Sequence, residues 1–436
     1  MDFFCVEAKY PLTFRKKDAE LLGEHLRHRH SIDLTGMKRV GISNFLRFFL
    51  YNERAKESFV SKTEKHLFVS IDLNDLVERE LYAFWALTFK RLLDETVRSN
   101  ASEHTKQKIG DLFLYSIQTK DLFLLIDGIR QSLIRLVSED ILPTLFLLRF
   151  DRIKDVVTPA FFDNLEGLRD STHGKLAYVF TSFRNLGDLS PQAIDRSHLS
   201  TFCYTLSIKP ATVSDMKIIF EQYNQRYHLD FSSSQAKDLF TLVGGNVQYL
   251  QLGLVILNEQ GKSDSKNMAS MQDIFQQDER TNLFSEELWE SLLPKEKDLI
   301  LAIVGGNKIG DEERRAGQYI FETGFIIGEK NREKLFSPLF EQYIRTLAVK
   351  KQQREPELVF SKKEHLLYTL LERKVGQICE RDEIIEAVWP ENQEFGVSDW
   401  SIDRLMARVR SKLKKQTSPF EIRTIRTRGY MLTERV

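Results

Sequence analysis

The sequence predicts a multidomain protein that joins an α/β body to a smaller α+β module at its C-terminal end. Three observations support this fold class. The chain has 436 residues, more than one ordinary domain holds. Apolar strand-like runs alternate with helical stretches in the first half, and a capped helix pattern with a basic two-strand hairpin closes the chain. The 42% hydrophobic and 29% charged residues are typical of a globular protein.

Composition argues against several classes of protein. The longest apolar runs fall short of the roughly 18 residues that cross a bilayer, and the first residues lack a signal-peptide pattern. We therefore expect a cytoplasmic protein without membrane association. The cysteines Cys5, Cys203 and Cys379 show no ligand spacing, and the pair His28 and His30 is interpreted as solvated surface. We predict neither a disulfide framework nor a metal site.

The α/β body begins with a strand, a glycine loop and a helix. Gly36, Gly41 and Ser43 match the P-loop pattern G-x-x-x-x-G-K-[ST], but Ile42 stands at the lysine position. Backbone amides of such a loop can hold phosphate without the lysine. Binding of ATP or ADP by Gly36, Gly41, Ser43 and Asn44 therefore stays open, and weak or absent binding is the alternative we favour.

Further strand-like runs follow at residues 66–76, 144–153 and 175–186, with helical stretches between them. This order predicts a parallel sheet with helices on both faces. Residues 122–128 also form an apolar run that ends in an acid, as a metal-binding strand does. Their apolar positions recur at helical spacing, however, so we interpret this run as a helix.

The stretch PLTFRKKDAELLGEHL before the loop, together with these strands, resembles the archaeal-type branch of the STAND/AAA-like ATPases. The resemblance covers about residues 10–350. It implies a P-loop NTPase-like domain at 1–205, a helical lid at 206–262 and a winged-helix-like domain at 263–348. FTLVGGNVQYL stands in place of the family's G-G-x-P turn, and LFSPLF resembles the signature of the last strand and helix.

The parts that hydrolysis requires are missing. A working site needs the P-loop lysine and acidic residues at the end of the Walker B strand. In FLLRFDRI, Leu148 and Arg149 occupy the acidic positions, and Ile42 replaces the lysine. Lys38 and Arg39 lie in the loop, but we expect their side chains to leave from its other side. We therefore expect a pseudo-ATPase, not an enzyme, with no catalytic residues.

The last 80 or so residues carry the clearest signal. Ser361 and Glu364 form a capping box before a helical apolar pattern, and a second short helix and a turn follow. A third helix places apolar residues on one face and Arg404 and Arg408 on another, before two short strands around a glycine. Between residues 400 and 430, nine lysines and arginines oppose two acids, an excess of seven positive charges. A helix-turn-helix followed by a basic hairpin predicts a winged helix.

The motifs RDEIIEAVW, IDRLMARVRSKL and IRTRGY resemble the OmpR/PhoB-type winged-helix DNA-binding domain, here at 358–436 after a linker at 349–357. The resemblance implies that the third helix enters the major groove of double-stranded DNA while the wing contacts phosphates or the minor groove. Leu405 stands where the family commonly has a polar residue. By position, the DNA-facing places are Ser401, Arg404, Leu405, Arg408, Arg410, Lys412, Thr424, Arg426 and Arg428.

These features predict a sequence-specific DNA-binding protein, a transcription regulator whose degenerate body senses a signal, binds a partner protein or oligomerises. Two alternatives stay open. One is a nucleotide-switched ATPase that acts on DNA, like an initiator or a transposition ATPase. The other is an adaptor whose basic module binds protein. No receiver domain with a phospho-acceptor aspartate is visible, so we infer no phosphorelay input.

Overall fold

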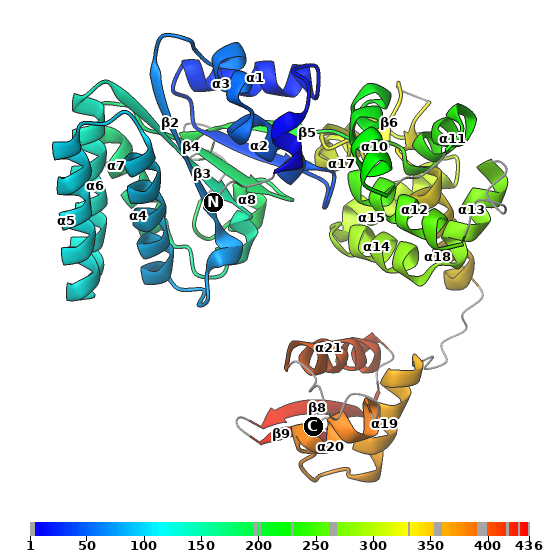
Figure 1. Ribbon diagram of the computed structural model, residues 1–436. Helices are drawn as coiled ribbons and strands as arrows, with labels where there is room; N and C mark the ends of the chain where they lie inside the picture. Colours follow the sequence, from blue (N-terminus) through cyan, green and yellow to red (C-terminus); the bar gives the residue numbers. More distant parts are fainter. Residues whose placement is uncertain are drawn as a thin grey trace. The chain divides into compact units, whose positions relative to one another are not determined.

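The computed structural model describes residues 5–194, 199, 202–227, 231–260, 268–329, 332–352, 360–389, 399–415, 418–425 and 428–434. The chain divides into two compact units, Met1–Leu347 and Ala348–Val436, which we describe separately (Figure 1). Within the described ranges, no helix is both long and apolar enough to span a membrane.

A five-stranded parallel sheet forms the centre of the first unit, in the order β2-β3-β4-β1-β5. This is the predicted P-loop-type sheet, and its fifth strand was not foreseen. The predicted boundary at residue 205 falls inside that strand. The strands are β1 (Ile32–Gly36), β2 (Lys65–Asp72), β3 (Ile141–Leu148), β4 (Ala177–Ser182) and β5 (Tyr204–Ile208).

Helices cover both faces of the sheet because its central strands are apolar on both sides. In β3, Phe146 points into one core while Leu145 and Leu147 point into the other, as the two-residue repeat of a strand requires. α4 and α6 contact β2 and β3, and α5 lies outside them (Figure 1). The elements are η1 (Val6–Lys9), α1 (Lys16–Arg27), α2 (Ile42–Tyr51), α3 (Glu53–Phe59), η2 (Leu73–Asp75), α4 (Leu81–Arg98), α5 (Glu103–Thr119), α6 (Leu122–Ser138), η3 (Phe150–Ile153), α7 (Pro159–Ser171) and α8 (Leu186–Leu189).

The rest of the first unit is helical and shares one hydrophobic core with α1 and α2. Gly244 and Gly245 take φ values of 56° and 83°, and Asn246 then caps α12 with its side-chain oxygen. The elements are α10 (Val213–Tyr227), α11 (Ser233–Val243), α12 (Val247–Gln260), α13 (Met268–Gln277), α14 (Glu279–Glu290), α15 (Pro294–Val304), α16 (Asp311–Ala316), α17 (Gln318–Glu322), β6 (Ile326–Ile327), β7 (Lys334–Leu335) and α18 (Pro338–Gln352).

The second unit has three helices and a hairpin among its described residues, around a separate core. The predicted capping box is present: Glu364 N–H donates to the Ser361 hydroxyl at 3.4 Å, and Ser361 N–H donates to the Glu364 carboxylate at 2.7 Å. The antiparallel hairpin closes at Gly429, whose φ is 142°. The elements are α19 (Lys362–Arg373), α20 (Arg381–Val388), α21 (Asp399–Lys415), β8 (Phe420–Ile425) and β9 (Gly429–Glu434).

Candidate nucleic-acid interface and P-loop

The glycine loop connects β1 to α2 as a P-loop does. Gly36 ends the strand, and Gly41 has a φ of 110°, where a side chain would be strained. A Cβ on Gly41 would also lie 2.6 Å from the Val247 side chain. Ile42 begins α2 and packs against the core. The lysine position therefore serves packing.

Two of the predicted phosphate-contacting residues differ in their surroundings. Asn44 is buried and donates from its amide nitrogen to the Glu7 carboxylate at 3.0 Å, and Arg47 donates to the same oxygen at 2.8 Å. Ser43 is half-buried and lines a cavity above the loop. The side chain of Asn44 is thus engaged within the protein, whereas Ser43 faces open space.

At the Walker B position, β3 ends at Leu148, as the motif alignment required. Arg149 follows with a φ of 59° and forms an ion pair with the carboxylate of Asp72, at the end of β2. Its N–H donates to the Thr181 hydroxyl at 2.9 Å. Asp151, the one acid left in the motif, has its pKa raised by burial. A cation thus occupies the place where a working site puts a metal-binding acid.

A cavity of about 640 Å³ lies over the P-loop. We expect Lys38 and Arg39 to leave from the other side of the loop, but in the structure both line this cavity. The backbone at Arg39 has a φ of 58°. No group of three or more His, Cys, Asp or Glu in the described residues could hold a metal ion. The lining is Gly36, Met37, Lys38, Arg39, Val40, Gly41, Ile42, Ser43, Asn44, Arg47, Asn74, Arg149, Asp151, Arg152, Thr181, Ser182, Phe183, Val247, Gln248, Gln251 and Glu287.

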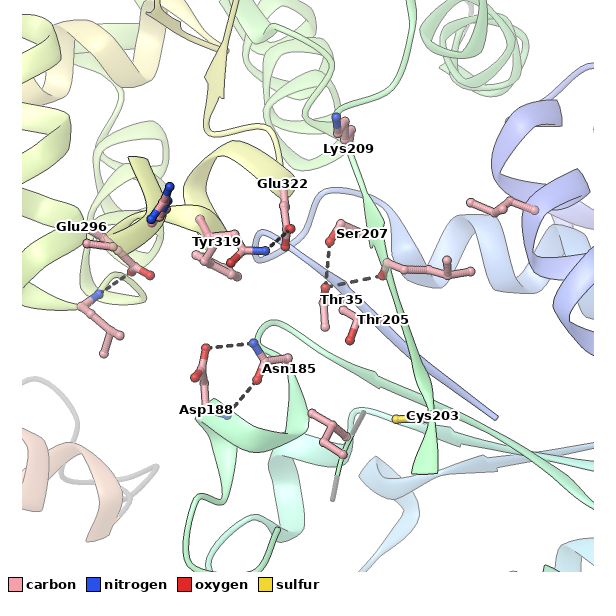
Figure 2. A pocket seen from close by; sticks show the side chains of 17 residues that line it. Thr35, Asn185, Asp188, Cys203, Thr205, Ser207, Lys209, Glu296, Tyr319 and Glu322 are labelled. Carbon is pink, nitrogen blue, oxygen red and sulfur yellow. Dashed lines mark hydrogen bonds between the residues drawn. The ribbon is translucent and has the colours of Figure 1, made fainter. Parts of the chain in front are cut away.

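A second cavity of about 640 Å³ lies between β5, α8 and α17 (Figure 2). Thr35 and Ser207 share a hydroxyl contact of 3.3 Å on one wall, and Asn185 donates to Asp188 at 2.9 Å on another. Tyr319 lies across the space from them (Figure 2). The Tyr319 hydroxyl donates to the Phe183 carbonyl at 2.6 Å.

A buried ion pair joins the end of β4 to the helical part of the unit. The Arg184 guanidinium donates to the Glu296 carboxylate at 3.0 and 2.5 Å and to the Ser291 carbonyl at 2.9 Å. Their side chains are only 6% and 4% exposed. The guanidinium also lies 4.2 Å from the centre of the Tyr319 ring. No local sequence pattern pointed to this pair.

In the second unit, α21 divides into a buried face and an exposed basic face. Arg404 and Arg408 are exposed, one helical turn apart. Apolar residues on the opposite face pack on α19, α20 and the hairpin, and the amphipathic pattern that predicted the helix is therefore its packing pattern. These buried residues are Ile402, Leu405, Met406, Val409 and Leu413.

Three predicted contact residues of α21 hold the domain together. Leu405 is 7% exposed, within the core, so it offers DNA little surface. Arg410 donates to the Ile422 carbonyl at 2.9 Å and to the Thr424 hydroxyl at 2.7 Å. Lys412 forms an ion pair with Glu364, which is 4% exposed. In the structure all three pack against or brace the helix, and their contact with DNA stays a prediction.

The wing holds two further predicted residues in the described part of the chain. Thr424 and Arg428 are exposed, on β8 and next to β9. Arg426 and the side chain of Ser401 lie outside the described residues. We call the four exposed residues Arg404, Arg408, Thr424 and Arg428 together the basic face.

Sequence reasoning missed a polar cluster that fixes the angle between α21 and the hairpin. The Tyr430 hydroxyl donates to the Asp403 carboxylate, and Arg381 donates to Asp403 at 2.9 Å and to the Tyr430 oxygen at 3.1 Å. Burial and the hydrogen bond to Asp403 raise the pKa of Tyr430 to about 12. The sequence signal that could have indicated this cluster is Asp403, an acid among the basic residues of α21.

Comparisons with known proteins agree with this geometry. Residues 354–432 match the family model described as "Transcriptional regulatory protein, C terminal". The transcriptional regulatory protein YxdJ of Bacillus subtilis is 29% identical over 140 residues, which are 32% of this chain and 54% of YxdJ. The chain thus matches about half the length of this curated relative.

Solved structures similar to the chain come from archaea and a bacterium. The Walker-type ATPase PABY2304 of Pyrococcus abyssi is 16% identical, with 76% of this chain and 96% of that chain covered and a TM-score of 0.47. The ORC2 protein of Aeropyrum pernix is 12% identical, with 79% and 96% covered and a TM-score of 0.45. The RuvB Holliday junction branch migration motor of Thermotoga maritima is 12% identical, with 79% and 96% covered and a TM-score of 0.34.

The second unit therefore has the helices, the hairpin and the exposed arginines of a winged helix, in the residues that the family model matches. The sequence of residues 354–432 belongs to the OmpR/PhoB-type family of DNA-binding domains.

Proposed function

We propose that the chain is a sequence-specific regulator of transcription that binds double-stranded DNA through the basic face. The observation that carries this proposal is the exposure of Arg404 and Arg408 on the outer side of α21, above a fully packed inner side. A helix of this kind fits the major groove, where arginine can bind both acceptors of a guanine edge.

The wing extends the same surface. Thr424 and Arg428 are exposed at the hairpin, where they can hold phosphates beside the groove. Arg410 ties Thr424 to α21, so helix and wing meet the DNA as one rigid piece. Such preorganisation favours a specific site because less flexibility is lost on binding.

For the body we propose a role without ATP hydrolysis: sensing a signal, binding a partner protein or self-association. Ile42 provides no charge for the phosphates, and Arg149 repels a metal ion at the place where an acid should hold it. A winged helix of this size commonly acts in pairs on DNA, and the body is the part of the chain large enough to arrange a second copy.

A DNA titration tests the proposal. The purified full chain is footprinted on its own promoter, and binding to the protected fragment is followed by fluorescence anisotropy between about 50 and 200 mM salt. We expect the logarithm of the binding constant to fall with the logarithm of salt, by roughly 0.9 per phosphate neutralised. We also expect preference over random DNA by about a thousandfold or more.

Two results would contradict the proposal in different ways. Salt-independent binding, or none, would favour the adaptor, whose basic module contacts protein. DNA-stimulated phosphate release from ATP that is lost in the Ser43→Ala variant would favour the ATPase acting on DNA.

A further inference from the structure

We propose that the P-loop cavity is closed by a carboxylate of the protein itself. In this view Glu287 competes with polyphosphate anions for Lys38 and Arg39, so that an anion in the cavity and α14 docked on the loop exclude one another. The proposal concerns the first unit only and does not depend on DNA binding.

The geometry at Glu287 is that of an internal anion in a basic cavity. Its carboxylate lies 3.0 Å from Arg39 Nε and 3.9 Å from Lys38 Nζ. It lines the same cavity as Gly41 and Ser43. The loop residue Arg39 keeps a φ of 58°, which residues other than glycine seldom adopt. The loop therefore presents its two cations to α14.

The rest of the loop is held by the lid and by the N-terminal segment. Val247, the first residue of α12, packs on Gly41, and the buried Asn246 places its amide nitrogen 3.7 Å from the sulfur of Met37. Arg15 donates to the Val40 carbonyl at 3.2 Å. These contacts fix the loop, whereas the partly exposed pair with Glu287 lines the cavity, where a charged ligand can reach it.

Charge explains why the two states exclude each other. An ordinary P-loop meets phosphate with a lysine and a magnesium ion, whereas here Lys38 and Arg39 are the cations that the loop itself supplies. A polyphosphate at the loop would bind these cations and is repelled by the Glu287 carboxylate. Arg47, Arg149 and Arg152 line the same cavity. The ion pair is partly exposed, with side-chain exposures of 55% for Arg39 and 35% for Glu287. Exposed pairs are weak, so a multiply charged ligand can displace this one.

The buried pair behind the loop would keep the helical part attached when the exposed pair opens. Glu296 lies on α15, directly after α14, and its bond to Arg184 is shielded from solvent. The ring centre of Phe183, the residue before Arg184, lies 5.0 Å from Lys38 Nζ. Displacement of Glu287 would thus loosen α14 while α15 stays anchored to β4.

Binding of inorganic triphosphate to the full chain, in EDTA and at low salt, tests the competition by calorimetry. We expect Glu287→Gln to bind triphosphate about fivefold more tightly than the unmodified protein, because the repelling charge is removed and the cations are released. The control Glu312→Gln removes an equal charge from an exposed position on α16 and should leave the affinity unchanged.

A second readout follows α14 directly. Triphosphate should speed hydrogen exchange in α14 of the unmodified protein and leave exchange in α15 unchanged. The proposal is overturned if Glu287→Gln gains no affinity, if the control gains as much, or if triphosphate leaves α14 exchange as it was. None of these outcomes changes the result expected from the DNA titration. The proposal on the P-loop cavity and the proposal on DNA binding can therefore be refuted independently.

Discussion

The P-loop region and the basic face both carry arginines, but they use them differently. Around the P-loop, Arg149 faces Asp72 and Arg39 faces Glu287, so carboxylates of the same unit meet these cations. On α21, Arg404 and Arg408 stand on the exposed side of a helix whose opposite side is packed. In the first unit these ion pairs join segments that lie far apart in the sequence, whereas exposed arginines on a groove-sized helix can support recognition of DNA.

The largest expected effect concerns a buried ion pair that holds the first unit together. Arg184→Ala removes one partner of a buried ion pair and leaves Glu296 enclosed without that partner. We expect the first unit to lose about 3–5 kcal/mol of stability toward urea unfolding. The control Arg79→Ala, at an exposed position, should cost little. Equal stability of the two variants would show that the pair does not hold the joint.

A second prediction concerns pH. Burial raises the pKa of Asp33 to about 7, above its ordinary value of 3.8. The folded chain therefore keeps a proton that the unfolded chain loses, so stability falls as pH rises from about 4 to 7 and then levels off. Relative to Asp33→Asn, the unmodified protein should lose up to about 4 kcal/mol over this window. Parallel stability curves for the two proteins would refute the shift.

A smaller effect tests the bracing of the basic face. Tyr430→Phe removes the hydroxyl that donates to Asp403 and accepts from Arg381. We expect a loss of about 1–2 kcal/mol in the stability of the second unit, because two hydrogen bonds are lost without a change of shape. Thermal unfolding of the full chain, followed by fluorescence, measures it. An unchanged unfolding curve would mean that the cluster contributes nothing.

The last prediction is that restoring the P-loop lysine does not restore ATP hydrolysis. Ile42→Lys restores the P-loop lysine, but Leu148 and Arg149 still stand where the metal-binding acids belong. We therefore expect no ATP hydrolysis above that of a sample without protein, in the presence or absence of DNA. Turnover in this variant would show that the lysine was the one missing part.

Those parts of the fold that a single local sequence pattern determines could be predicted from the sequence. The capping box at Ser361 and the apolar stripe of α21 gave the second unit, and the alternation of strands and helices gave the sheet. β5 was missed because it is a short edge strand, and its residues Tyr204 and Thr205 are exposed. A strand without an apolar run has no signal until its neighbour β1 is placed.

The site was less accessible to sequence reasoning because its contacts join distant segments. Arg410 and Lys412 looked like surface cations, and only the fold shows that they reach Thr424 and Glu364. Glu287 lies 248 residues from Arg39 along the chain. Periodicity and motifs describe neighbours in sequence, so pairs of this kind cannot be derived from them.

The central claim is that recognition of DNA belongs to the exposed arginines of α21, and Arg408→Ala tests it most directly. We measure binding of the full chain to its footprinted site and to random DNA, with the exposed Arg373→Ala on α19 as the control. The account predicts that Arg408→Ala weakens specific binding by about 1–3 kcal/mol and narrows the preference over random DNA, while the control does neither. Unchanged affinity and preference in Arg408→Ala would contradict it.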